Sequence, residues 1–130
     1  MAAAVWAAED VDRIGSAEEL RIAAKRHDGT LRRWVPIWVV CVGDQVYVRT
    51  WYRRDTGWFA HLLDSRRAAV QVPGLRADVV VADVAAESEQ LHADVDAAYH
   101  TKYGRYGTSG VGPMVTAEAA ATTLRLSPEQ

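Results

Sequence analysis

Short extended runs divided by turn residues occupy the first two thirds of the chain. Residues 33–42 read Arg-Trp-Val-Pro-Ile-Trp-Val-Val-Cys-Val, and this nearly unbroken apolar run predicts a strand that is covered on both faces. An Asp-Gly pair at 28–29 and a Gly-Asp pair at 43–44 indicate hairpin turns on either side of it. Pro36 cannot donate a ladder hydrogen bond, so the strand should lie near a sheet edge or bulge. The other expected strands are residues 20–26, 46–51, 68–72, 75–84 and 122–126.

Helical periodicity is clearest over residues 88–105, and shorter helices are expected at 7–14, at 58–65 and from Thr116. The apolar positions that recur at helical spacing in the long segment are Leu91, Val95, Ala98 and Tyr99. Short strands joined mostly by hairpins favour a closed or nearly closed antiparallel barrel of about six strands. We therefore expect a mainly β protein with flanking helices, of the α+β class, forming a single domain over residues 1–130.

Composition excludes several classes of protein. The net charge of −2 gives no reason to expect binding to nucleic acid or to an anionic membrane. No apolar run approaches the roughly 20 residues of a membrane helix, and the first residues lack a basic leader, so a cytoplasmic location is expected. The one cysteine, Cys41, excludes an internal disulfide, and the four histidines show no ligand spacing that would predict a metal site.

The aromatic residues are unusual in kind. The chain has five Trp and five Tyr but one Phe, whereas a plain core would use Phe freely. Because Trp and Tyr carry polar groups that need partners when buried, this bias suggests a cleft for a flat ligand or a subunit interface. Large core and rim residues are the alternative interpretation.

One candidate wall for such a cleft lies on the second and third strands. Trp34 and Trp38 fall on the same side of one strand, and Arg49 and Trp51 share a face of the next. A hairpin around 43–44 would bring Trp38 near Tyr47 or Arg49, where a stacking or cation–π contact is worth ~0.5–2 kcal/mol. The alternative is that these side chains belong to the barrel core.

Two more arginines, Arg53 and Arg54, follow on the next loop, and guanidinium groups match phosphate or carboxylate. They could equally be solvated and balanced by Asp55 and Asp64.

A second candidate feature is the end of the late helix, where Tyr99, Tyr103 and Tyr106 fall at i, i+4 and i+7. Tyr103 and Lys102 are candidate acid–base groups, and Tyr99 and Tyr106 are candidate substrate contacts. Such a stripe could instead serve packing alone. The glycines that follow, at positions 104, 107, 110 and 112, would make either a lid or a simple connector.

The segment 20–84 resembles the FMN-binding split β-barrel proteins, which include pyridoxamine-phosphate oxidases and deazaflavin-dependent reductases. The resemblance rests on Arg-His-Asp-Gly-Thr at 26–30, Pro-Ile-Trp-Val-Val at 36–40 and Gly-Asp-Gln-Val-Tyr-Val-Arg at 43–49, followed by an arginine-rich loop. The later stretch 98–106, Ala-Tyr-His-Thr-Lys-Tyr-Gly-Arg-Tyr, is similar to a small subfamily of uncharacterised function.

The resemblance implies a split β-barrel that holds FMN or a deazaflavin along its second and third strands, at the boundary of a homodimer. It places Arg33 and residues 36–38 along the ring system. The residues implied at the phosphate are Arg49, Thr50, Arg53 and Arg54, and those expected to contact substrate are Trp51, Trp58, Tyr99 and Tyr106. In this sequence, Asp55 and Trp58 depart from the family's phosphate loop.

Three hypotheses of function follow. The first is a flavin- or deazaflavin-dependent oxidoreductase that acts on a small aromatic or polyketide-like metabolite. The second is a cofactor-free use of the same cleft, either as a cyclase or isomerase or as a binding protein for a hydrophobic metabolite. The third is a structural dimer, in which the Trp and Tyr residues form the interface.

Overall fold

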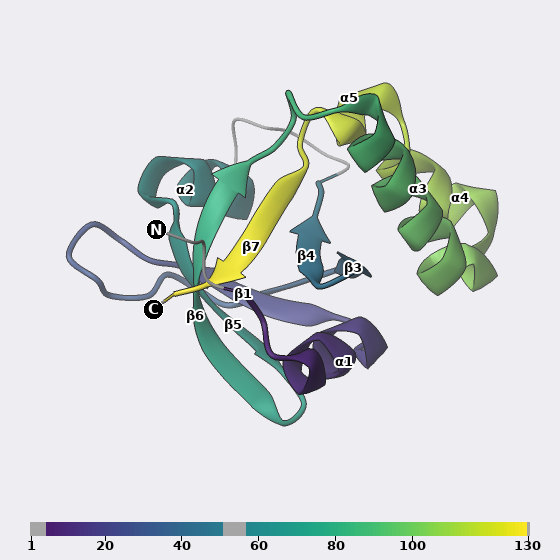
Figure 1. Ribbon diagram of the computed structural model, residues 1–130. Coiled ribbons are helices and arrows are strands. Elements are labelled where there is room, and N and C mark those ends of the chain that lie inside the picture. The colour runs from purple at the N-terminus through teal and green to yellow at the C-terminus, as the bar shows by residue number, and fades with distance from the viewer. Residues whose placement is uncertain (1–4, 51–56, 130) are drawn as a thin grey trace.

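The computed structural model describes residues 5–50 and 57–129, and Figure 1 shows its arrangement. The strands are β1 (Leu20–Ala24), β2 (Val35–Ile37), β3 (Val40–Val42), β4 (Gln45–Val48), β5 (Arg67–Val72), β6 (Leu75–Asp83) and β7 (Leu124–Pro128). The α-helices are α1 (Ala8–Ser16), α2 (Gly57–Ser65), α3 (Glu89–Tyr103), α4 (Gly107–Val111) and α5 (Ala117–Ala120). Two 3₁₀ turns, η1 (Gly104–Tyr106) and η2 (Gly112–Met114), flank α4.

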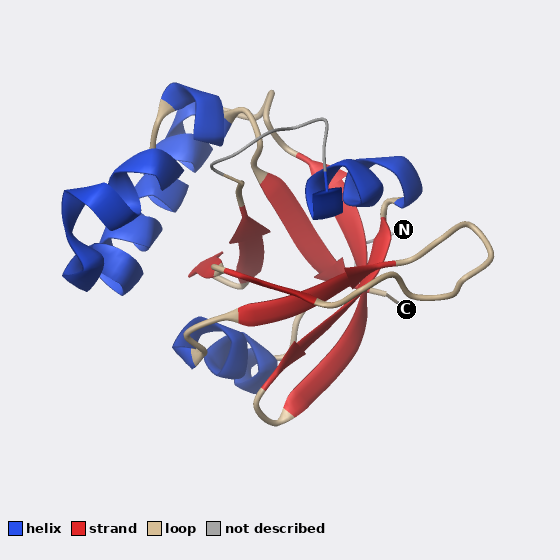
Figure 2. Ribbon diagram, turned by 180° about the vertical axis from the view of Figure 1, so that it is seen from behind, coloured by secondary structure: helices blue, strands red, loops and turns tan. Residues whose placement is uncertain are grey.

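The strands form one antiparallel sheet in the order β2-β1-β5-β6-β7-β4-β3, which curls on itself (Figure 2). Its two edge strands, β2 and β3, are consecutive in the chain and separated only by Trp38 and Val39, so the edges are drawn together. The protein is thus an α+β fold with a split β-barrel, as expected. The described residues contain seven strands rather than about six, because the predicted strand 33–42 is divided in two.

The division occurs at Val39, which is fully buried. Its N–H donates to the Tyr103 hydroxyl at 3.1 Å, and its carbonyl accepts from Lys102 Nζ at 2.7 Å. Side chains of α3 therefore replace a strand as the partner of this backbone, and the chain leaves β2 to pair with β4 as β3. The prediction of one continuous strand carrying both Trp34 and Trp38 was wrong for this reason. Pro36 lies on edge strand β2, as its missing donor requires.

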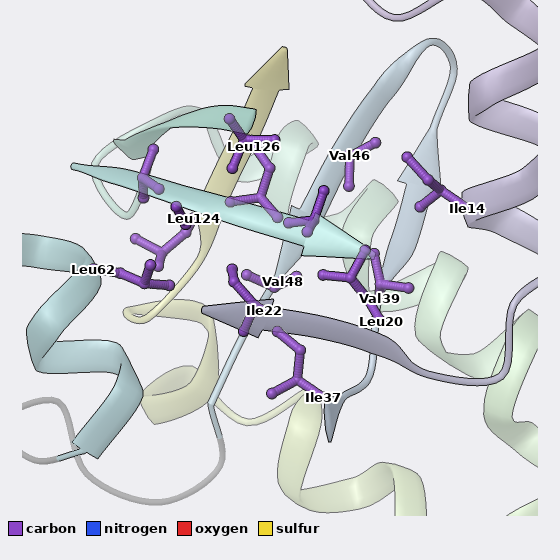
Figure 3. Close-up of a cluster of buried hydrophobic side chains, with 14 of the residues drawn as sticks. Ile14, Leu20, Ile22, Ile37, Val39, Val46, Val48, Leu62, Leu124 and Leu126 are labelled. Atoms are coloured by element: carbon purple, nitrogen blue, oxygen red, sulfur yellow. The ribbon is translucent and has the colours of Figure 1, made fainter. Parts of the chain in front are cut away.

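The main core fills the barrel and is built from aliphatic residues of β1, β4, β5, β6 and β7, closed by Ile14 of α1 and Leu62 of α2 (Figure 3). Each fully buried aliphatic side chain contributes about 1.5–3 kcal/mol. The Trp6 indole is buried at the edge of this core and donates to the Leu126 carbonyl at 2.9 Å.

A second cluster joins α3 to the outer face of β3 and β4 and contains Val40, Tyr47, Val95, Tyr99 and Tyr103. The helix begins at Ser88, whose Oγ accepts from the Leu91 N–H at 3.2 Å. Figures 1 and 2 show α3 and α4 together at one end of the barrel, away from α2. Within the described residues, the longest helices are too short or too polar to cross a membrane.

Candidate functional site

A cleft of about 500 Å³ opens between the β2–β3 edge, the end of β4, the start of α2 and the α4–η2 segment. Four of the residues proposed from sequence line it: Trp38, Arg49, Thr50 and Trp58. Pro36 and Ile37, which the resemblance placed along the ring system, also line it, as does Gly110 of the proposed lid or connector. Sequence reasoning missed the other described residues of the lining, which are Glu19, Ser109, Pro113 and Met114. The cleft therefore combines a largely aromatic and apolar wall with a few polar groups.

Strand alternation explains how β4 supplies Arg49. Val46 and Val48 point into the barrel core, whereas Tyr47 joins the cluster under α3, so Arg49 falls on the α3 side as well. The β3–β4 register pairs Val40 with Tyr47, and continued by two residues it sets Trp38 opposite Arg49. The ladder itself ends at Val40, and Trp38 and Arg49 share the cleft lining but have different aromatic partners: Trp38 stacks on Tyr103, and the Arg49 guanidinium lies over Tyr99.

Trp38 is held in place by tyrosines from the end of α3. Its ring stacks on Tyr103, with centroids 4.0 Å apart and planes 3° apart, and Tyr106 lies 5.4 Å away. Tyr99 continues the series at 6.1 Å from Tyr103. The predicted tyrosine stripe therefore packs on the Trp38 indole, through Tyr103 and Tyr106 directly and through Tyr99 by way of Tyr103. Tyr99 and Tyr103 are buried, and Tyr106 is exposed.

The Arg49 guanidinium is almost completely buried and bonded within the protein. Its Nη1 donates to Asp96 Oδ1 at 2.5 Å and to the Met114 carbonyl at 2.9 Å, and its Nε donates to Thr123 Oγ1 at 2.9 Å. The longest contact, 3.5 Å, joins Nη2 to the His92 carbonyl. Arg49 thus fastens β4 to α3, η2 and the start of β7, and its charge is matched by Asp96.

Tyr103 and Lys102, the candidate acid–base pair, lie behind the cleft lining. The Tyr103 hydroxyl accepts from the Val39 N–H and can donate to the Glu18 carbonyl at 2.9 Å. Burial raises the pKa of this phenol. Burial also lowers the pKa of Lys102, whose Nζ donates to the carbonyls of Val39 and Ile14. Both groups are engaged with backbone atoms in this structure.

The glycine-rich stretch after α3 forms α4 and its flanking 3₁₀ turns, and it supplies one wall of the cleft. A side-chain cluster ties its beginning to the loop before β1: the Glu18 carboxylate accepts hydrogen bonds from Tyr106 and Arg105. These two hydrogen bonds, that from Tyr106 first, hold the pKa of Glu18 below its usual value. Gly107 follows with a φ of +74°, so the chain enters α4 through a conformation that favours glycine.

Gly107→Ala is expected to lower the free energy of unfolding by about 1–3 kcal/mol, because a φ of +74° with a ψ of −179° is a backbone conformation that essentially only glycine adopts. In the part of the chain that the structure describes, no atom would contact that Cβ within 4 Å, so the effect would be backbone strain alone. Gly104→Ala is the matched control, since Gly104 has a φ of −58° and equally open surroundings. It should be neutral or stabilise the fold by up to about 1 kcal/mol. Urea unfolding of both variants would measure the difference, and equal stabilities would contradict this description of the turn.

A smaller basic hollow shares Trp58 with the cleft. It is lined by Ala24, Arg26, Arg32, Arg33, Val35, Gly57, Trp58 and His61. Among the described residues, the side chains of Arg32 and Arg33 make no ion pair or hydrogen bond. Arg33, expected along the ring system, thus lies in this hollow. The Arg-Arg pair after the 28–29 turn was the available sequence signal for it.

Two more aromatic residues proposed from sequence, Tyr99 and Trp34, lie outside the cleft lining. Tyr99 lies beneath the Arg49 guanidinium, 5.7 Å from its Cζ, and burial raises the pKa of its phenol. Trp34 is removed from Trp38 and packs under the Arg76 guanidinium at 5.3 Å. Trp51, Arg53 and Arg54 lie outside the described residues.

Solved structures confirm the fold. The conserved hypothetical protein Rv2991 from Mycobacterium tuberculosis matches with a TM-score of 0.62 and 16% identity, over 97% of this chain and 81% of its own. A FAD-binding protein (mll6688) from Mesorhizobium loti matches with a TM-score of 0.58 and 15% identity, over 100% of this chain and 95% of its own. At these identities the likeness extends to the fold alone.

The sequence itself has no match among curated proteins. A family model does match residues 10–126, which is most of the chain. The protein therefore belongs to the bacterial family described as "Uncharacterized protein conserved in bacteria (DUF2255)".

Proposed function

We propose that this protein binds a flavin, of the FMN or deazaflavin type, with its ring system in the cleft between Trp38 and Trp58. The observation that carries the proposal is that one cleft is lined by residues of three separate segments that were selected from sequence for the flavin ring (Trp38), for its phosphate (Arg49 and Thr50) and for substrate (Trp58). A volume of about 500 Å³ lies within the usual range of small-molecule sites, roughly 300–1,000 Å³. The FAD-binding protein that shares this fold gives further support.

The residues of the cleft fit the flavin ring better than its phosphate. Pro36, Ile37, Trp38 and Trp58 offer flat or apolar surfaces to an aromatic ring. Arg49, by contrast, is bonded to Asp96 and to backbone carbonyls. We therefore assign the phosphate to the neighbouring basic hollow, where the guanidinium groups of Arg32 and Arg33, unpaired among the described residues, each offer a planar set of donors.

A bound flavin would supply hydride transfer, and the protein would position it and exclude water. The proposed activity is thus that of an oxidoreductase for a small aromatic or polyketide-like metabolite. Tyr103 and Lys102 remain the proposed acid–base groups. Both form hydrogen bonds with the backbone of Val39 in this structure. Assembly as a homodimer, which the family resemblance implies, stays a prediction.

The proposal is tested by titrating the protein with FMN and with riboflavin, which shares the ring but lacks the phosphate. We expect both to show a shifted flavin absorbance on binding, with FMN the tighter ligand. Arg33→Gln should weaken FMN by about tenfold, the value of a charge-assisted hydrogen bond, and leave riboflavin unchanged. Trp58→Leu should weaken both ligands.

One control variant completes this test. Arg76→Gln removes a guanidinium that stacks on Trp34 outside the cleft and should leave both affinities unchanged. The proposal would be refuted if FMN, FAD and a deazaflavin, each at saturating concentration, all left the Trp fluorescence of the protein unchanged.

The second candidate is a cofactor-free cleft that acts as a cyclase or isomerase, or as a binding site for a hydrophobic metabolite. It is favoured by the internal bonding of Arg49, which leaves no unpaired cation on the described lining of the cleft. Binding of a flat aromatic compound without binding of riboflavin or FMN would select this candidate over the first.

A further inference from the structure

Glu19 lines the cleft and is exposed, and its carboxylate differs from that of its neighbour Glu18 in its hydrogen-bond partners. The Glu18 carboxylate is bonded to Arg105 and Tyr106. The Glu19 carboxylate has no ion-pair or hydrogen-bond partner among the residues that the structure describes. One of two adjacent carboxylates therefore serves the fold, while the other remains available at the cleft.

The charge of Glu19 is not compensated by the rest of the described lining. Arg49 is the other charged residue there, and its guanidinium already pairs with Asp96 at 2.5 Å. The arginines without a partner among the described residues, Arg32 and Arg33, lie in the basic hollow that shares Trp58 with the cleft. The two adjoining pockets thus differ in charge: the hollow is positive at Arg32 and Arg33, and the cleft is negative at Glu19.

The Glu19 side chain and the Trp38 indole line the same cleft. Burial is the main cause of the raised pKa of Tyr103, and the negative charges of Glu18 and Glu19 add to it. Tyr103 in turn stacks against Trp38, a member of the cleft wall. A carboxylate beside an indole attracts a cation in two ways, by direct charge pairing and through the negative face of the ring.

We propose that the Glu19 end of the cleft selects a substrate that carries a protonated amine on a flat aromatic skeleton. The amine would pair with Glu19 at the Trp38 end of the cleft, and the aromatic skeleton would lie beside the flavin ring. This inference rests on the proposed function in that it names the substrate class for the same cleft. It predicts that ligands with a carboxylate at this end are disfavoured, because Glu19 would repel them.

The test uses three probes with one skeleton and different charge: 1-naphthylmethylamine, 1-naphthalenemethanol and 1-naphthoate. Calorimetric titration of the full chain should show that the amine binds about tenfold more tightly than the alcohol and that the carboxylate binds weakest. In Glu19→Gln the amine should fall to the affinity of the alcohol, while the affinity for the alcohol stays within about a factor of two.

Glu9→Gln is the matched control, since it makes the same charge change at an exposed α1 residue outside the cleft lining. It should preserve the preference for the amine. The proposal is overturned if amine and alcohol bind equally to the unaltered protein, if Glu9→Gln acts as strongly as Glu19→Gln, or if no probe binds at millimolar concentration.

Flavin binding is scored separately on the same samples. Loss of all flavin binding with a Glu19-dependent amine preference intact would refute the proposed cofactor and leave this inference standing. Flavin binding without a Glu19-dependent preference for the amine would refute this inference and leave the proposed cofactor standing.

Discussion

Arg49→Ala is expected to lower the free energy of unfolding by about 3–5 kcal/mol, enough to remove much of the stability of a domain of this size. The substitution empties a fully buried site and removes the donors to the Met114 carbonyl and Thr123 Oγ1. Buried acceptors without a donor cost about 1–3 kcal/mol each, and the cavity adds to that. Urea unfolding followed by circular dichroism would measure the change.

Two further variants separate the contributions at Arg49. Asp96→Asn keeps the Arg49 contacts with Met114 and Thr123 and should cost less, about 1–2 kcal/mol, because the Asp96 side chain is 37% exposed. Arg49→Lys retains the charge but lacks the planar fork that reaches several acceptors, so it should fall between the two. An Arg49→Ala variant that unfolds at the same urea concentration as the unaltered protein would show that the guanidinium does not join β4 to α3.

Tyr103→Ala should also lower the free energy of unfolding by about 3–5 kcal/mol, since it removes a buried ring that stacks on Trp38. Tyr103→Phe isolates the hydroxyl. It should cost about 1–3 kcal/mol, because the buried Val39 N–H then loses its acceptor. Both values would come from urea unfolding.

Tyr106→Phe provides the matched control for the hydroxyl, because it makes the same chemical change at an exposed tyrosine that stacks on the same indole and whose hydroxyl donates to the exposed Glu18 carboxylate. It should change the stability by less than about 0.5–1 kcal/mol. A Tyr103→Phe variant no less stable than Tyr106→Phe would contradict the role of this hydroxyl at the break between β2 and β3.

The strand break at Val39 shows where sequence patterns stop being sufficient. The run 33–42 has the composition of one buried strand, and its local propensities predict no interruption. The interruption depends on Tyr103 and Lys102, which lie more than 60 residues away and bond the Val39 backbone. Hairpins and the long helix, by contrast, depend on turn residues and periodicity within one segment, so they were predicted close to their observed positions.

The candidate site divides in the same way. Trp38, Arg49, Thr50 and Trp58 come from segments with strong local signals, and the structure places all four on one cleft. The bonding of Arg49 to Asp96 and Met114 could not be predicted, because those partners come from α3 and η2 and are set by how these pack on the sheet. For the glycine-rich stretch, the sequence left a lid and a simple connector as alternatives. The structure shows where the stretch lies, as a helical wall of the cleft, and does not choose between them.

The central claim, that a flavin ring occupies the cleft at Trp38 and Trp58, is tested most directly by the indole N–H signals of the protein in ¹H–¹⁵N NMR spectra during an FMN titration. We predict that the signals of Trp38 and Trp58 shift progressively until the cleft is saturated. The Trp6 indole, bonded to the Leu126 carbonyl, and Trp34, packed under Arg76, lie outside the lining and should keep their positions. Saturating FMN that leaves Trp38 and Trp58 unmoved, or that shifts Trp6 and Trp34 in their place, would contradict the claim.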